Sequence, residues 1–354
     1  MKFKININQP IYLLISAFLV LCIAMPYSCK KAKISNKPPD CSADSFVLLE
    51  SESLISINRL RGEQIEVIKE FEINEHTHYA YDGCHYLILA DSEERNIKVY
   101  HWSGRFYLEE EIPLEIEIVT VFTEGKNVFI GGYPGESKFL QFNIQNREWH
   151  FPHIPEILNM SGKAIDDFVI HNNQLIAIDN IYTPKYFLFY DLMEDAEVEY
   201  KSKFLHRNLQ PEYITKAEIS PDFLGVLSTT ASGWVGYYTH VVIYPLSNME
   251  EEVFALPSKR FDQGSEGRIV DFRIYGNEIV FAHTKHGIGR IYMDEEFFHE
   301  EMDIFKWDYE FYEPYIEYIE LEGLVSLTSV PDAPYFIATT LNAQEEYEHR
   351  VFPL

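Results

Sequence analysis

Two stretches that begin 104 residues apart share one pattern of side chains and decide the fold: DFVIHNNQLIAID at residues 167–179 and DFRIYGNEIVFAH at residues 271–283. Each starts with a short run of strand-forming residues, turns at His-Asn-Asn or Tyr-Gly-Asn, and continues as an apolar run. Asn and Gly accept the backbone angles that tight turns need, so each stretch is predicted to be a β-hairpin. Weaker copies of the pattern begin near residues 78, 120 and 216.

The hairpins belong to larger units that recur along the chain. A third strand is expected after most hairpins, for example at residues 96–100 and 186–190, and a fourth at residues 106–112. One unit precedes the five copies, at residues 46–73, and one follows them, at residues 316–352. The units are therefore roughly 40 to 55 residues long, which is typical of the blades of a β-propeller.

An all-β fold, a β-propeller over residues 45–354, is the fold class that these units predict. Seven blades fit the spacing best, and six are the alternative; a pair of β-sandwiches accounts less well for the similarity of the units. Tyr and Phe, which suit half-buried strands, number 24 and 25. The first unit shows only three strands, so we expect the C-terminal segment to supply its missing strand and close the ring.

Residues 1–28 have the composition of an export signal. Lys2 and Lys4 precede a mostly apolar run of 15 residues, Ile11–Met25. As a helix this run would rise about 22 Å, less than the roughly 30 Å of a hydrocarbon layer, so a cleaved signal fits better than a membrane span. A signal anchor that stays in place is the alternative.

A cysteine, Cys29, follows this segment directly after Ser28. The arrangement resembles the lipobox of bacterial lipoproteins, with Pro26 and Tyr27 in place of the usual aliphatic and small residues. The resemblance implies that residues 1–28 are removed and that Cys29 is acylated as the first residue of the mature chain. Acyl chains, at about 0.8 kcal/mol per buried CH₂, would hold the protein on a bilayer.

The signal and the repeats together resemble bacterial envelope lipoproteins with a WD40-like or six- to seven-bladed propeller, although no Trp-Asp repeat signature is present. Residue 30 is a lysine, whereas an aspartate at this position would resemble an inner-membrane retention signal. This favours the outer membrane with the propeller facing the periplasm; the cell surface and a soluble periplasmic protein are alternatives. Residues 29–44 are polar and rich in lysine, and they are predicted to form a flexible tether.

The charge of the chain limits its partners. Removal of the signal leaves 27 basic and 56 acidic residues, a net charge of −29. Nucleic-acid binding depends on a basic surface that neutralises phosphates, so nucleic acid is excluded as a partner. Solubility alone explains such a charge, and attraction of cationic partners is the alternative. A monomer is expected.

Two cysteines, Cys41 and Cys84, remain once Cys22 leaves with the signal and Cys29 is acylated. In an oxidising periplasm they could form a disulfide, and two separate thiols are the alternative. No Cys-x-x-Cys or Cys/His spacing typical of zinc is present. His283-x-x-His286 and His76-x-His78 each lack a convincing third ligand, so no metal site and no cofactor are predicted.

One position per unit stands out on the strand that would line the centre of the ring. Aligning the copies there gives His78, Thr120, Asp167, Lys216 and Asp271. All five are polar, just ahead of apolar residues. Hydrogen bonding between blades explains this pattern without a ligand; a polar funnel that binds a ligand is the alternative. Lysine among the five would repel a metal ion.

Two other segments are candidate surfaces. Trp234, Tyr237 and Tyr238 lie in a glycine-flanked hairpin, where exposed rings could stack on a sugar or contact a protein, and packing within the sheet is the alternative. Residues 294–313 are rich in carboxylates and aromatic side chains, and they form either the outer strands of a blade or an acidic insertion.

A binding scaffold without catalysis, for an envelope protein or a glycan, is the function that the sequence favours. Motifs of serine hydrolases, zinc peptidases and phosphate-binding loops are absent. The alternatives are a glycan-active enzyme with chemistry in the funnel around His78, Asp167 and Asp271, and a small-ligand sensor that uses the same funnel. Whether the chain is an enzyme therefore stays open.

Overall fold

The computed structural model describes residues 45–102, 105–124, 126–133, 139–150, 167–171, 174–179, 185–191, 203–205, 213–232, 236–247, 252–257, 267–300, 312–330 and 335–354. These residues form an all-β structure, as the sequence predicts, and include two 3-10 turns, η1 (Glu295–Phe297) and η3 (Glu313–Tyr315). No helix within these ranges is long and apolar enough to cross a membrane. The predicted signal and tether lie outside them.

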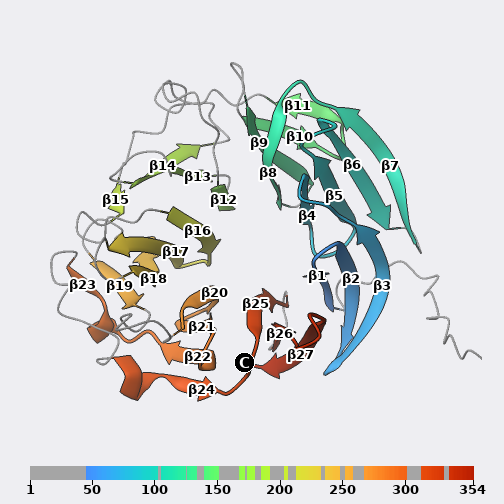
Figure 1. Ribbon diagram of the computed structural model, residues 1–354. Helices are drawn as coiled ribbons and strands as arrows, with labels where there is room; N and C mark the ends of the chain where they lie inside the picture. The colour runs from blue at the N-terminus through green and yellow to red at the C-terminus, as the bar shows by residue number, and fades with distance from the viewer. Residues whose placement is uncertain are drawn as a thin grey trace, which may run out of the picture.

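Seven antiparallel sheets follow one another along the described part of the chain (Figure 1). The first contains β1 (Ser45–Glu50), β2 (Leu54–Arg61) and β3 (Gln64–Glu72). The second contains β4 (Thr77–Tyr81), β5 (Tyr86–Asp91), β6 (Asn96–Trp102) and β7 (Phe106–Pro113). The third contains β8 (Glu117–Glu124), β9 (Asn127–Tyr133), β10 (Phe139–Asn143) and β11 (Glu148–His150).

The remaining sheets repeat this plan. The fourth contains β12 (Asp167–His171), β13 (Gln174–Asp179), β14 (Lys185–Asp191) and β15 (Lys203–Leu205). The fifth contains β16 (Tyr213–Ile219), β17 (Phe223–Ser232), β18 (Gly236–Pro245), β19 (Glu252–Pro257) and β23 (His299–Glu300). The sixth contains β20 (Ile269–Tyr275), β21 (Glu278–His283), β22 (Gly287–Tyr292) and β24 (Glu317–Ile319). The seventh contains β25 (Leu324–Ser329), β26 (Tyr335–Leu341) and β27 (Tyr347–Pro353).

The first strand of each sheet lies nearest the centre of a ring, and later strands lie farther out (Figure 1). The second strands are apolar almost throughout, as in β5 and β21, because neighbouring sheets cover both of their faces. Outer strands such as β7 are mostly exposed, with a few buried or half-buried side chains among the exposed ones. The two repeats that begin at residues 167 and 271 form the hairpins β12–β13 and β20–β21, as predicted.

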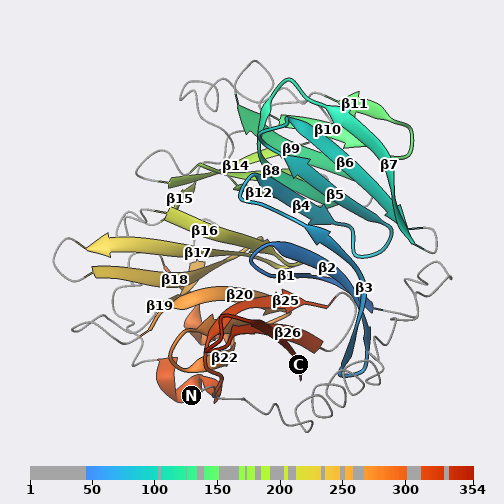
Figure 2. The ribbon, with the colours of Figure 1, turned by 45° about the vertical axis from the view of Figure 1, so that its right-hand side comes forward.

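The first and last sheets lie side by side in both views (Figures 1 and 2), but they share no strand. The prediction that the C-terminal segment completes the first sheet is therefore wrong for the described residues, since β27 pairs with β26. A cluster of buried apolar side chains joins the two sheets instead: Val47, Leu49, Leu60, Val330 and Ile337. Burial of apolar surface replaces backbone pairing at this junction.

Two unit boundaries also differ from the prediction. The last unit does not start at residue 316, because β24 pairs with β22 and forms the outer strand of the sixth sheet. The seventh sheet starts at Leu324. Within the acidic segment 294–313, residues 299–300 form β23, which pairs with β19 of the fifth sheet, so this part is an outer strand, one of the two alternatives. Residues 301–311 of this segment lie outside the described ranges.

A β-bulge recurs on the innermost strands of four sheets. It falls between Ile118 and Thr120, between Ile214 and Lys216, between Ile269 and Asp271, and between Leu324 and Ser326. In each case the residue after the bulge resumes the pairing. A bulge interrupts the alternation of side chains between the two faces of a strand. It therefore determines to which face the polar residue after it belongs.

Candidate functional site

The aligned polar positions occupy equivalent places in their sheets. His78, Thr120, Asp167, Lys216 and Asp271 pair with the second strand at Ala90, Gly131, Ile178, Leu227 and Ala282, respectively. The recurring bulge identifies Ser326 as the equivalent residue of the seventh sheet, which the sequence comparison missed. The stretch after it, VPDAP at residues 330–334, resembles the Ser-Pro-Asp of the copy that begins at residue 216 and could have revealed Ser326.

Asp271 connects three consecutive sheets. Its Oδ1 accepts hydrogen bonds from the Lys216 Nζ of the fifth sheet and, within its own sheet, from the Phe272 backbone N–H at 2.8 Å. Its Oδ2 accepts one from the backbone N–H of Leu327 in the seventh sheet, at 2.7 Å. Asp271 is only 6% exposed. These contacts match the interpretation that the ring positions hydrogen-bond between sheets.

Two further charged side chains, Glu218 and Arg273, complete this cluster. Arg273 Nη1 lies 3.2 Å from Glu218 Oε2 and 3.1 Å from Asp271 Oδ1. Glu218 Oε1 accepts the backbone N–H of Ile274 at 2.8 Å. Both side chains were missed from the sequence. Each lies two residues beyond an aligned position, hence on the same face of its strand, so the patterns Lys-x-Glu and Asp-x-Arg could have revealed them.

Burial raises the pKa of Glu218 from 4.5 to about 7. The folded protein therefore holds this proton more tightly than the unfolded chain does, and the contribution of Glu218 to the free energy of unfolding falls as the pH rises from about 4.5 to about 7. We expect Glu218→Gln to lose less stability than the unmodified protein between pH 5 and pH 8. Urea unfolding at both values measures this; the same pH dependence in both proteins would contradict it.

His283, of the His283-x-x-His286 motif, has a local role. Nδ1 of His283 accepts the backbone N–H groups of Lys285 and His286, both at 3.2 Å, and closes the turn between β21 and β22. Burial lowers the pKa of His283 to about 4, and burial also lowers the pKa of His78. Within the described ranges, no three His, Cys, Asp or Glu side chains are grouped so that they could hold a metal ion.

The other predicted residues are placed only in part. Tyr237 and Tyr238 lie at the start of β18, opposite Ala231 and Thr230, which agrees with the predicted hairpin. Trp234 and Cys29 lie outside the described residues. Cys84 is disulfide-bonded. Its predicted partner, Cys41, also lies outside the described residues, so that pairing stays a prediction.

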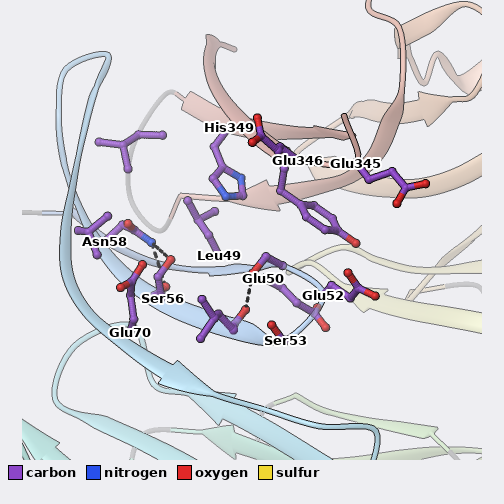
Figure 3. A pocket seen from close by; sticks show the side chains of 15 residues that line it. Leu49, Glu50, Glu52, Ser53, Ser56, Asn58, Glu70, Glu345, Glu346 and His349 are labelled. Carbon is purple, nitrogen blue, oxygen red and sulfur yellow. Dashed lines mark hydrogen bonds between the residues drawn. The ribbon is translucent and has the colours of Figure 1, made fainter. Parts of the chain in front are cut away.

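A pocket of about 400 Å³ lies between the first and last sheets, and Figure 3 shows its lining. Its walls come from the β1–β2 turn, the outer strand β3 and the β26–β27 turn. Five glutamates line it: Glu50, Glu52, Glu70, Glu345 and Glu346. No lysine or arginine of the described chain lines it. No pattern in the sequence pointed to this site, since its two groups of residues are about 300 positions apart.

The pocket also has apolar and buried polar walls. Leu54, Ile65 and Val67 line it, and Val67 is 45% exposed. Asn58, which is 1% exposed, donates its Nδ2 hydrogens to the carbonyl oxygen and the Oγ of Ser56, at 2.9 and 2.8 Å (Figure 3).

A β-bulge on β3 determines which charges reach the pocket. Ile65 pairs with Leu60, and Val67 pairs with Asn58. The pairing then skips one residue of β3, so that the next pairs are Lys69 with Ile57 and Glu70 with Ser56. Ser56 and Asn58 lie on the pocket face of β2, so the extra residue places Glu70 on that face. Lys69 instead lies with its Nζ 5.7 Å from the ring centre of Phe71, which packs toward the second sheet. Without the bulge, Lys69 would take the pocket position.

Comparison with known proteins identifies the fold. No protein-family model and no curated protein matches the chain. Among solved structures, it is similar to the β-propeller domain of Cps50 (Swd1) from Myceliophteria thermophila, with a TM-score of 0.53 and 10% identity over 88% of this chain and 94% of that one. It is also similar to the dihydro-heme d1 dehydrogenase NirN, with a TM-score of 0.50 and 14% identity over 91% of this chain and 62% of that one. Identities this low show the fold alone, and that fold is a β-propeller.

Proposed function

We propose that this chain is an exported lipoprotein in which a seven-bladed propeller, held on a membrane through Cys29, serves as a binding scaffold for an envelope protein or a glycan. The observation that carries the proposal is the combination of an apolar N-terminal segment followed by a cysteine with a propeller fold. The outer membrane, on its periplasmic side, is the location that Lys30 favours.

Packing between consecutive sheets supports seven blades over six. Shared apolar clusters join the first sheet to the second, the second to the third, the fifth to the sixth and the sixth to the seventh. Ile176 of the fourth sheet packs with the fifth. The cluster around Val47 and Ile337 joins the seventh sheet to the first. These clusters cover six of the seven junctions between consecutive sheets, which favours one blade for each sheet.

A scaffold fits the contacts of the inner strands better than an enzyme does. The Asp271 carboxylate already accepts hydrogen bonds from Lys216, Arg273 and two backbone N–H groups. A general acid or base needs an oxygen that is free to reach the substrate. Because Asp271 has this structural role, alanine at this position would not distinguish an enzyme from a scaffold. Affinity capture of the lipidated protein from membranes, after crosslinking, tests the scaffold directly.

Lipid attachment is tested at Cys29. We expect the unmodified protein to incorporate an alkyne-labelled fatty acid and to sediment with membranes, and Cys29→Ser to lose the label, because the acyl chains join through the cysteine. Cys22→Ser is the matched control and should keep both properties. Release of Cys29→Ser from the membrane would show that the lipid is the only anchor. An unmodified protein that never takes up the label would refute the lipoprotein assignment.

A further inference from the structure

We propose that the pocket between the first and last sheets binds an organic cation: an ammonium or guanidinium group carried on an apolar stem. This inference rests on the binding role proposed above and names the chemistry of what is bound. The cation can be a lysine or arginine side chain of a partner protein or a free polyamine, and the experiment below separates these sources.

The negative charge of the pocket is not compensated by the described part of the chain. None of its five glutamates forms an ion pair there. By contrast, Glu66, on the opposite face of β3, has Arg59 and Arg61 within 3.8 Å. The β3 bulge removes Lys69 from the pocket face. The chain therefore concentrates carboxylates around a cavity and keeps its own cations away, which leaves the site open to an external cation.

The buried amide of Asn58 is a second, independent feature. Within the described residues its side chain makes two hydrogen bonds, both donated by Nδ2, and its Oδ1 accepts none. The residue is 99% buried, yet it lines the cavity. The Oδ1 is therefore left for a donor that enters the pocket, and a ligand that brings an N–H group there would satisfy it.

The shape of the pocket favours an organic cation over a metal ion. A metal needs several ligands that converge on one point, and the described residues contain no such group. The carboxylates are spread along three segments, whereas Leu54, Ile65 and Val67 form an apolar wall. A long side chain or polyamine buries its methylene groups against such a wall while its charged ends meet the carboxylates.

His349, the one histidine in the lining, does not oppose a cation. Its Nδ1 lies 3.0 Å from Thr339 Oγ1, and burial lowers its pKa. The ring is therefore neutral at neutral pH and adds no positive charge to the pocket.

Calorimetric titration of the mature, lipidated chain in detergent micelles tests the proposal. The probes are a short lysine-rich peptide with blocked termini, the same peptide with glutamine in place of lysine, and spermidine. We expect the lysine peptide to bind and the glutamine peptide not to bind. Tighter binding of the peptide identifies a partner protein as the source of the cation, and tighter binding of spermidine identifies a free polyamine.

Two variants locate the binding. Glu70→Gln combined with Glu345→Gln should weaken the affinity for the cation roughly fivefold to tenfold, because two exposed carboxylates are removed. Val67→Lys should weaken it at least as much, since it places a fixed cation on the pocket face at an exposed position. The matched control, Glu320→Gln with Glu322→Gln, removes the same charge from exposed residues between β24 and β25 and should change the affinity less than twofold.

Three results would overturn the proposal: no binding of either cation to the unmodified chain, equal binding of the glutamine peptide, or an equal loss of affinity in the control pair. The last would mean that only the overall charge attracts the cation. Thermal unfolding of each variant checks that it is folded. None of these three results affects the fatty-acid labelling of Cys29. They would therefore refute cation binding in the pocket without refuting the lipid-anchored scaffold.

Discussion

Replacing Asp271 by alanine is expected to lower the free energy of unfolding by about 3–5 kcal/mol, the cost of breaking a buried ion pair by removal of one partner. The variant would remove the nearer of the two carboxylates around the Lys216 ammonium and leave only Glu218, at 3.8 Å, where the Lys216 side chain is only 24% exposed. It would also leave the backbone N–H of Leu327 without its acceptor. The loss would affect the fifth, sixth and seventh sheets together. Urea unfolding followed by circular dichroism measures it.

Thr120→Ala is the matched control for this prediction. Thr120 occupies the equivalent position in the third sheet, and its side chain makes no hydrogen bond with the described residues. We expect the control to change the free energy of unfolding by less than about 1 kcal/mol, as is usual for substitutions away from such features. A similar loss in both variants would show that the position, and not the ion pair, matters.

Gly287→Ala is expected to destabilise the protein by about 2–5 kcal/mol, combining the cost of a left-handed backbone with that of overpacking. Gly287 has φ +83°, and a Cβ there would overlap the carbonyl oxygen of Ile319 and the backbone nitrogen of Leu321. Both atoms belong to the main chain, so they cannot move away through a change of side-chain rotamer. Ile319 belongs to β24, which pairs with β22 through only three residues, so the substitution would displace β24 from the sixth sheet.

Gly276→Ala separates the two causes. Gly276 has φ +58°, and a Cβ there would meet no atom within 4 Å. It should therefore show the conformational cost alone, about 1–2 kcal/mol. Hydrogen exchange at the amides of β24 that donate to β22 should increase in Gly287→Ala and stay unchanged in Gly276→Ala. Slow exchange of these amides in both variants would contradict the displacement of β24.

Local patterns predicted the local parts of this fold. The hairpins β12–β13 and β20–β21 were readable because the turn residues and the apolar runs lie next to each other in the chain. The alignment of Lys216 with Asp271 was correct, since equivalent positions in repeated units occupy equivalent places in space. Their ion pair, and the part that Glu218 and Arg273 play in it, depends on how the fifth sheet packs on the sixth.

The sequence by itself determined the all-β class and the repeated hairpins of the propeller, because strand and turn preferences act over a few neighbouring residues. It also supplied the predicted signal and Cys29. Only the tertiary structure decided how the ring closes, since β27 pairs with β26 and apolar packing joins the last sheet to the first. The acidic pocket exists for the same reason: Glu70 and Glu345 meet only when the two ends of the chain pack together, and the β3 bulge decides that Glu70 and not Lys69 faces inward.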